Sequence, residues 1–376
     1  MHHPQETTLG SRLLRASPII FGVSLLTLFL GEFGWFSTFE TTILDTWFRL
    51  MKPRDVQEIV IVEITDEDYE TLFQSVSPLD PQTVHNLING IAKAHPKVIG
   101  VDLDTSSQSF ESFSIESEWP PVIWAVDTTQ IPDTEVLIPG KVLGKAFAQG
   151  GGRTGFALLP QDHDGLFRRY RRYFPGASRD DEPFDSFPWA IVKAYSSTLA
   201  SKDSGEAECI LNFSGDRYAF KRIRASYVMQ LADTPGWQQN GPLRDKICLV
   251  GGVYRAARDE YPTPLGPMDG VQLMAHSVAT DLRGGGIHHA NEFVMIVLEI
   301  LGGYLLVILY HRFRLGTALM LSLFAIPVFA LLASYVAFSS LGLWANSVPL
   351  FAAVLIHQLY DHAREYQKMY EELMPR

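Results

Sequence analysis

The chain has 376 residues, enough for one large or two medium domains, and 47% of its residues are hydrophobic. Its formal net charge is −11, and most of the acidic excess lies in the middle of the sequence. A surface of that sign argues against nucleic acid as a partner, because phosphates require basic side chains. The long apolar runs are concentrated at the two ends, which indicates a membrane protein with a hydrophilic central block.

The first apolar run covers residues 18–36 and carries a single charge, Glu32. It is long enough to cross a ~30 Å hydrocarbon core, so we expect transmembrane helix 1 here, after a short segment of residues 1–17. The alternative is a cleaved signal peptide, but no small-residue cleavage site follows the run. Glu32 falls within a turn of the expected outer end, where an acidic side chain needs no functional explanation.

The hydrophilic block of residues 37–291 begins with a βαβ pattern. Residues 58–64 form a nearly continuous apolar run that ends before Asp66, as is typical of a buried parallel strand. Apolar residues at helical spacing follow within residues 80–96, and a second apolar run ends at Asp102. Acidic residues therefore stand at the carboxyl ends of both expected strands.

Later patterns continue the alternation, with strands expected near residues 120–127, 208–215 and 245–252 and helices near 186–199, 225–232 and 270–285. We therefore expect an α/β fold, a three-layer sandwich with a mostly parallel sheet. Ligands of such sheets usually bind beyond the carboxyl ends of the strands. The residues expected to converge there are Asp66, Asp102, Asp127, Asn212 and the loop after Gly251.

Two further features of the block bear on its fold. Asp164–Gly165 predicts a hairpin turn, followed by residues 166–172, in which arginines alternate with aromatic residues on an expected strand. We expect a structural or ligand-facing role for its arginine face. The only cysteines, Cys209 and Cys248, lie in apolar β-branched runs, so we expect two buried strand thiols, with a disulfide as the alternative.

Motifs for catalysis are missing from the block. The loop after Gly251 lacks the lysine of a Walker loop, and no Gly-x-Ser-x-Gly elbow occurs in the sequence. The acids at the strand ends could hold a divalent cation, but caps and loop solvation are the more frequent outcome. His288 and His289 have no nearby cysteine or second histidine pair for zinc. We expect no enzyme activity, no metal and no cofactor.

Three apolar runs close the chain, and we expect transmembrane helices 2, 3 and 4 at residues 293–310, 315–338 and 341–360. Their short links require antiparallel hairpins. Glu299 lies inside helix 2, where a helix–helix contact is slightly preferred over a proton or ion site. Residues 361–376 are expected to form a cytoplasmic helical tail, with a short coiled coil as one form of it.

Basic residues in the short flanks set the orientation. With four spans all three basic flanks fall on one side, so both termini are expected in the cytoplasm and residues 37–291 outside. The basic residues are Arg12, Arg15, Arg312, Arg314, Arg364, Lys368 and Arg376.

Residues 245–285 resemble the closing signature of the type-2 CHASE sensory domain, an extracellular module of bacterial receptors. The signature comprises an apolar strand that ends in glycine, an aspartate ahead of a Thr-Pro loop, and a Gly-Val helix start. The matching positions are Lys246, Gly251, Asp259, Thr263, Pro264, Gly270, Val271, Ala275 and His276.

Other stretches are similar to the same family, and with them the resemblance covers essentially the whole chain. One span before the module and three after it is the arrangement of that family. The further matching positions are Asp45 and Arg49 after the first span, and Asp162, Asp164, Gly165, Arg168 and Arg169 in the hairpin.

Three segments depart from the family pattern. Residues 75–84 replace a tryptophan-containing stretch expected before the first helix, and residues 102–110 differ from the pattern after the second strand. Residues 108–134 are compressed. These changes fall where a ligand is expected, so the resemblance implies no particular ligand. Family members commonly continue into a cyclase, kinase or phosphatase domain, whereas residues 361–376 are too few for one. We therefore expect this tail either to dock on a separate cytoplasmic effector or to be the stub of a lost or separately encoded output domain.

The resemblance and the expected topology together imply a sensor in the bacterial cytoplasmic (inner) membrane. Its external module would bind an unknown extracellular or periplasmic ligand and pass a shift through the helices, with homodimerisation left open. The alternatives are a structural partner of another membrane protein and, less favoured, a tethered hydrolase. Candidate ligand-binding residues are Asp66, Asp102, Arg168, Asp259 and Thr263. Candidate architectural residues are Asp45, Arg49, Asp164, Gly165, Gly251, Pro264, Gly270 and His276.

Overall fold

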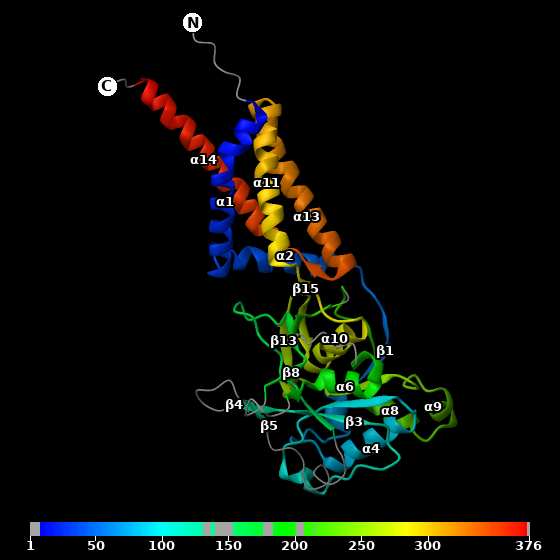
Figure 1. Ribbon diagram of the computed structural model, residues 1–376. Helices are drawn as coiled ribbons and strands as arrows, with labels where there is room; N and C mark the ends of the chain where they lie inside the picture. Colours follow the sequence, from blue (N-terminus) through cyan, green and yellow to red (C-terminus); the bar gives the residue numbers. More distant parts are fainter. Residues whose placement is uncertain are drawn as a thin grey trace. The chain divides into compact units, whose positions relative to one another are not determined.

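A computed structural model of the protein describes residues 8–130, 137–139, 153–175, 183–200, 207–213 and 215–373. The chain divides into two compact units, Met1–Trp47 with Ile287–Arg376 and Phe48–Gly286. Figure 1 shows the helices of the first unit and the mixed α/β structure of the second. The boundary near the amino end falls inside helix α2 (Ser37–Leu50).

The second unit is built on a six-stranded sheet in the order β11-β1-β12-β2-β3-β6. Every neighbouring pair in it is parallel, which confirms the expected α/β fold with a mostly parallel sheet. The strands are β1 (Val56–Ile64), β2 (Val98–Asp102), β3 (Val122–Val126), β6 (Arg153–Phe156), β11 (Phe220–Arg224) and β12 (Ile247–Gly252). The main helices are α4 (Pro81–Ala92), α6 (Phe187–Tyr195), α8 (Ala225–Leu231) and α10 (Gly270–Leu282).

Side chains of β2 show how the helices cover the sheet. Ile99 and Val101 belong to a buried cluster that includes the apolar residues of α4 and α8. Gly100 faces the opposite way, because a Cβ there would come within 2.6 Å of Ile191 in α6. Helix α6 also packs on α10, which contacts β1 and β12. Helices α4 and α8 therefore lie on one face of the sheet and α6 and α10 on the other (Figure 1).

Short elements complete the second unit. The small helices are α3 (Asp66–Thr71), α7 (Ser197–Ala200), α9 (Pro235–Asn240) and the 3₁₀ turns η1 (Gln108–Ser112) and η2 (Arg255–Ala257). The antiparallel pairs are β4 (Thr128–Gln130) with β5 (Leu137–Pro139), β7 (Arg169–Arg171) with β10 (Glu208–Ile210), β8 (Tyr173–Phe174) with β9 (Phe184–Asp185), and β13 (Glu260–Thr263) with β14 (Gly266–Asp269).

The hairpin expected around Asp164–Gly165 is only half right. The turn is present, since Gly165 has a φ of +85° and its N–H donates to the Asp162 carbonyl at 2.9 Å. The flanking strands do not pair with each other, because β6 joins the parallel sheet beside β3 and β7 pairs with β10. Strand β10 consequently lies outside the six-stranded sheet, and Asn212, which follows it, does not follow a strand of that sheet.

Three helices of the first unit are long and apolar enough to cross a membrane, among the residues that the structure describes: Leu9–Glu32, Glu292–Arg312 and Leu315–Leu341. They correspond to α1, to α11, and to a continuous helix made of α12 (Leu315–Met320), the π-helical η3 (Leu321–Ala325), α13 (Ile326–Val336) and the π-helical η4 (Ala337–Leu341). The last helix, α14 (Val348–Leu373), starts later than the fourth expected span and continues through most of the expected tail. Between η4 and α14, β16 (Leu343–Trp344) pairs with β15 (His288–His289).

Polar contacts join α1 to α11 within the first unit. The Thr27 hydroxyl donates to Glu299 Oε2 at 2.8 Å, and Ser17 and Tyr304 share a hydrogen bond of 2.9 Å. The Glu299 side chain is buried in this contact. Glu299 therefore makes a helix–helix contact, the reading that was slightly preferred from the sequence.

Candidate functional site

The carboxyl end of β1 leads directly into helix α3. Thr65 caps this helix, and Asp68 three residues later completes a capping box by accepting the Thr65 N–H at 3.1 Å. Burial alone would raise the pKa of Asp68, but hydrogen bonds from Ser226 and Thr65 outweigh it and lower the pKa. Asp68 is therefore an ionised structural residue.

Asp66 connects this helix to the loop that follows β12. Its Oδ1 accepts the Arg255 N–H at 2.8 Å, and the Arg255 guanidinium lies 3.4 Å from Oδ2. Beside this pair the rings of Tyr69 and Tyr254 stack, with centroids 4.2 Å apart and planes 7° from parallel. The ends of β1 and β12, which are adjacent in the sheet, thus converge as expected.

The end of β2 contributes Asp102, which lies near Asp259 of the Thr-Pro segment. Although part of the residue is accessible, protein surrounds the Asp102 carboxyl, and this burial together with the charge of Asp259 raises its pKa to about 8. Burial also raises the pKa of Asp259, against an opposing hydrogen bond from Tyr261. Two carboxyls and a phenol therefore share a poorly solvated region that favours the protonated form of Asp102.

The Thr-Pro segment forms the β13–β14 hairpin. The Thr263 hydroxyl donates to the Gly266 carbonyl at 2.5 Å, and Arg49 Nε donates to the Pro264 carbonyl at 3.0 Å. These contacts give Thr263, Pro264 and Arg49 roles in holding the turn. Because Thr263 is buried and already bonded within the turn, its hydroxyl is not presented outward.

Asp259 also borders the start of α10. The Gly270 N–H donates to the Asp259 carbonyl at 2.9 Å, and the Asp259 carboxylate occupies the place that a Cβ on Gly270 would need. Val271 packs in the same way on Gly251 at the end of β12. The hairpin, the sheet and the last helix of the unit are thus fixed together at one point.

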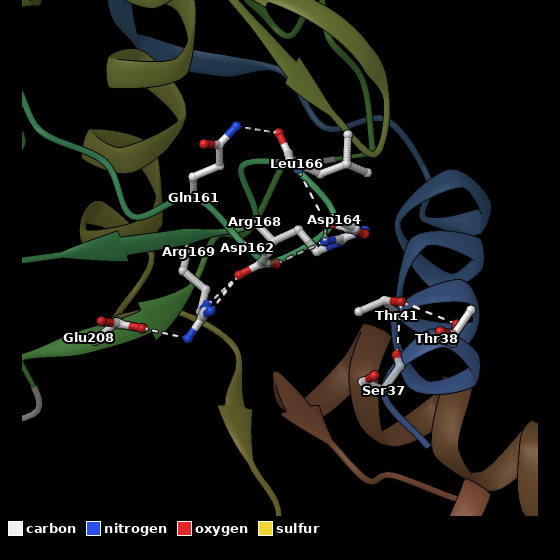
Figure 2. A network of polar contacts seen from close by, with 11 residues as sticks. Ser37, Thr38, Thr41, Gln161, Asp162, Asp164, Leu166, Arg168, Arg169 and Glu208 are labelled. Atoms are coloured by element: carbon white, nitrogen blue, oxygen red, sulfur yellow. Dashed lines mark hydrogen bonds and ion pairs between the residues drawn. The ribbon is translucent and has the colours of Figure 1, made fainter. Parts of the chain in front are cut away.

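Arg168 is enclosed by its own turn (Figure 2). Its guanidinium donates to Asp162 Oδ2 at 2.9 Å and to Asp164 Oδ2 at 2.7 Å, and its side chain is 1% exposed. The hydrogen bond from Arg168 is the main reason that the pKa of Asp164 is lowered. Arg169 bridges Asp162 to Glu208. The arginine cluster therefore includes an ion-pair network that secures the turn.

This turn also contacts the Thr-Pro hairpin. The Phe167 N–H donates to the Pro262 carbonyl at 2.9 Å, and the rings of Phe167 and Tyr261 meet edge to face at 4.9 Å. The Asp164–Gly165 turn and the β13–β14 hairpin therefore pack on each other through Phe167 and Tyr261, two residues that were not predicted from the sequence.

Sequence reasoning also missed a buried polar triad between α10 and residues 170–172. Arg172 Nε and Nη2 donate to Asp281 Oδ1 at 2.9 and 2.7 Å, and the Tyr170 hydroxyl donates to Asp281 Oδ2 at 2.7 Å. The Arg172 guanidinium also lies 4.9 Å from the centre of the Trp189 ring. The alternation of residues 166–172 was the signal, because Arg168, Tyr170 and Arg172 share the buried face of that segment.

His276 lies in the middle of α10 and is fully buried between Phe213 and Phe220, whose ring centres are 5.4 and 4.7 Å away. Neither ring nitrogen has a hydrogen-bond partner among the described residues. Burial, helped by the charges of Arg283 and Arg222, lowers the pKa of His276 to about 3. His276 is thus a neutral core residue. Asp45, also singled out from the sequence, lies in α2.

A cavity of about 560 Å³ lies between α3 and α8, beyond the carboxyl ends of β1 and β11. Arg224 on its wall pairs with Glu67 at 2.9 Å and with Asp68 at 3.3 Å. Among the described residues, no group of three or more His, Cys, Asp or Glu side chains is arranged to hold a metal ion.

A family model described as the CHASE2 domain matches residues 20–309. Searches of curated proteins and of solved structures found no match.

Proposed function

Because the chain belongs to the CHASE2 domain family, a family of sensory domains, we propose that it is a membrane-anchored sensory protein. In this proposal the unit Phe48–Gly286 binds a signal outside the cytoplasm, and the apolar helices pass the resulting shift to a separate effector. The family match, which extends over most of the chain, is the observation that carries the proposal.

We propose four membrane spans, formed by α1, by α11, by residues 315–341 and by the first part of α14. The three long apolar helices support the first three. The basic flanks support cytoplasmic termini and an external block, since Lys and Arg in short loops favour the cytoplasmic side. The domain boundaries expected from the sequence, with residues 37–291 as the sensory block in a three-layer sandwich, and the bacterial inner membrane location are part of the same proposal.

We place the signal-responsive region at the carboxyl ends of β1, β12 and β2, around Asp66, Asp102 and Asp259. Parallel sheets bind ligands at this edge, and the contacts described above bring these acids to it. Arg168 and Thr263, also candidate ligand residues, are bonded within their own turns, so in the proposal they support the site without contacting the ligand.

The route of the signal is proposed to start at the Thr-Pro hairpin. Its Pro264 carbonyl is held by Arg49 of α2, the helix that follows α1 in the chain, and Asp259 borders α10, which precedes α11. A ligand that binds one arrangement of this hairpin better than another would bias both connections. Helix α14 would present the shift to an effector or to a second copy of the chain.

Topology is the first test of the proposal. Fusions to alkaline phosphatase and to green fluorescent protein should be placed after residue 175, after residue 313 and at the carboxyl end. Phosphatase activity only at residue 175 and fluorescence only at the other two sites is the expected result. Fluorescence without phosphatase activity in the fusion after residue 175 would place this block in the cytoplasm and would contradict an external sensor.

Signal binding is the second test. The full chain in lipid nanodiscs should be screened with a metabolite and ion panel by thermal shift, and each hit followed by hydrogen exchange. A hit should protect β13–β14 amides and alter exchange in α14. The Asp259→Ala variant should lose the response in α14. If no compound in the panel raises the unfolding temperature of the chain, the chain is better explained as a structural partner of another membrane protein.

A further inference from the structure

A second cavity, distinct from the one between α3 and α8, lies beside the first turn of α4. Its volume is about 340 Å³, within the range of small-molecule sites. Helix α4 and the turn η1 both border it. The lining residues are Asp80, Pro81, Gln82, His85, Ser109, Ser112, Phe113, Ser114 and Glu116.

The floor of the cavity is aromatic and fixed. Phe113 is buried and packs edge to face on His85 at 5.6 Å and on Trp124 at 5.3 Å, while the His85 ring lies 5.0 Å from that of Trp119. His85 Nε2 is also 3.1 Å from Glu116 Oε1, which anchors the rim to the floor. The shape of the site thus exists before any ligand arrives.

The lining combines two carboxylates with one histidine, His85, which contacts Glu116. Its carboxylates are Asp80 and Glu116, and no lysine or arginine is among the lining residues. Asp80 accepts both hydrogen bonds from Thr83 through Oδ2, and Glu116 accepts from His85 and Ser114 through Oε1. Oδ1 of Asp80 and Oε2 of Glu116 are not used in these bonds. An anion would be repelled here, whereas a donor cation would find carboxylate and hydroxyl oxygens.

We propose that this cavity binds a small organic cation, an alkylamine whose ammonium group donates to Glu116, Asp80 and the Ser112 hydroxyl. The alkyl part lies against Phe113. A metal ion is a poorer occupant, since only two carboxylates line the site and no metal-binding group is found among the described residues.

The test uses three four-carbon probes of equal length, putrescine, 1,4-butanediol and succinate, titrated into the full chain in nanodiscs by calorimetry. Putrescine should bind saturably at low salt and more weakly at high salt, because the site is open to solvent. The diol and the diacid should not bind. Absence of saturable putrescine binding, or equal binding of the diol, would overturn the proposal.

Glu116→Gln keeps an acceptor for His85 and removes the charge, so it should weaken putrescine binding about tenfold. Ser112→Ala should weaken it less. The matched control is Glu111→Gln, which removes an exposed charge on η1 outside the cavity and should leave binding unchanged. Equal losses in Glu116→Gln and Glu111→Gln would mean general surface attraction and no site. Thermal unfolding of each variant confirms that the fold is kept.

Discussion

Arg172 donates two hydrogen bonds to a single carboxylate oxygen of Asp281, and both side chains are buried. Removing one partner of such a pair leaves a buried charge without compensation. Asp281→Ala should therefore lower the free energy of unfolding by about 3–5 kcal/mol, measured by urea unfolding of the detergent-solubilised chain. The control is Asp185→Ala, which breaks the more exposed pair with Lys193 and should cost less than about 1 kcal/mol. Similar losses in both variants would contradict the burial argument.

Gly270 and Asp259 provide a steric test of the hairpin junction. Gly270→Ala places a methyl group against the Asp259 carboxylate and should destabilise the chain by about 1–3 kcal/mol. Asp259→Ala should also destabilise, but the double variant should lose less than the sum of the two, because the clash is then relieved. Gly236→Ala in α9, where a Cβ would meet nothing within 4 Å, is the control. If the loss in the free energy of unfolding of the double variant equals the sum of the two single losses, the two residues do not interact.

Because of Asp102, the free energy of unfolding of the chain should fall as the pH rises. Its folded pKa of about 8 lies above the ordinary value of 3.8, so between these values the folded state holds a proton that the unfolded chain has released. This contribution is complete below about pH 4 and is lost as the pH rises to 8, with a slope of up to about 1.4 kcal/mol per pH unit. Asp102→Asn should flatten that loss, measured by urea unfolding from pH 5 to 8.5. The exposed Asp104→Asn should not, and an unchanged slope in Asp102→Asn would refute the assignment.

His276 acts in the opposite direction. Its folded pKa of about 3 lies below the ordinary 6.5, so on acidification the unfolded chain takes up a proton first. The contribution is complete above pH 6.5 and is lost as the pH falls towards 3. His276→Leu should make stability less sensitive to acid between pH 6.5 and 4, whereas His163→Ala, at an exposed site, should leave the dependence unaltered. The measurement is the urea midpoint at each pH.

Most of the sheet could be predicted from local pattern. Residues 58–64 and 98–102 read as buried strands because their side chains are apolar on both faces, and the helix between them follows helical spacing. The spatial order of the strands could not be predicted from the sequence. Strand β12 lies between β1 and β2 although most of the module separates it from them in sequence, and no local pattern encodes that insertion.

The candidate site was predicted in part. Asp66, Asp102 and Asp259 were singled out because they follow strands or match the family signature. Their neighbours Tyr69 of α3 and Tyr254 of the loop after β12 were missed, since the local sequence around a tyrosine does not identify its stacking partner. The β13–β14 hairpin was also missed, because prolines at Pro262 and Pro264 and its charges are typical of an irregular loop.

Cys209 and Cys248 are buried thiols that form no disulfide, as expected, and burial raises the pKa of the Cys248 thiol. They lie in different sheets, Cys209 in the two-stranded β7–β10 pair and Cys248 in β12, flanked by β1 and β2. The rates at which the two thiols are modified therefore report on the opening of two different parts of the fold. Under native conditions an alkylating reagent should modify Cys209 after local unfolding of the β7–β10 pair. It should modify Cys248 only after the six-stranded sheet unfolds.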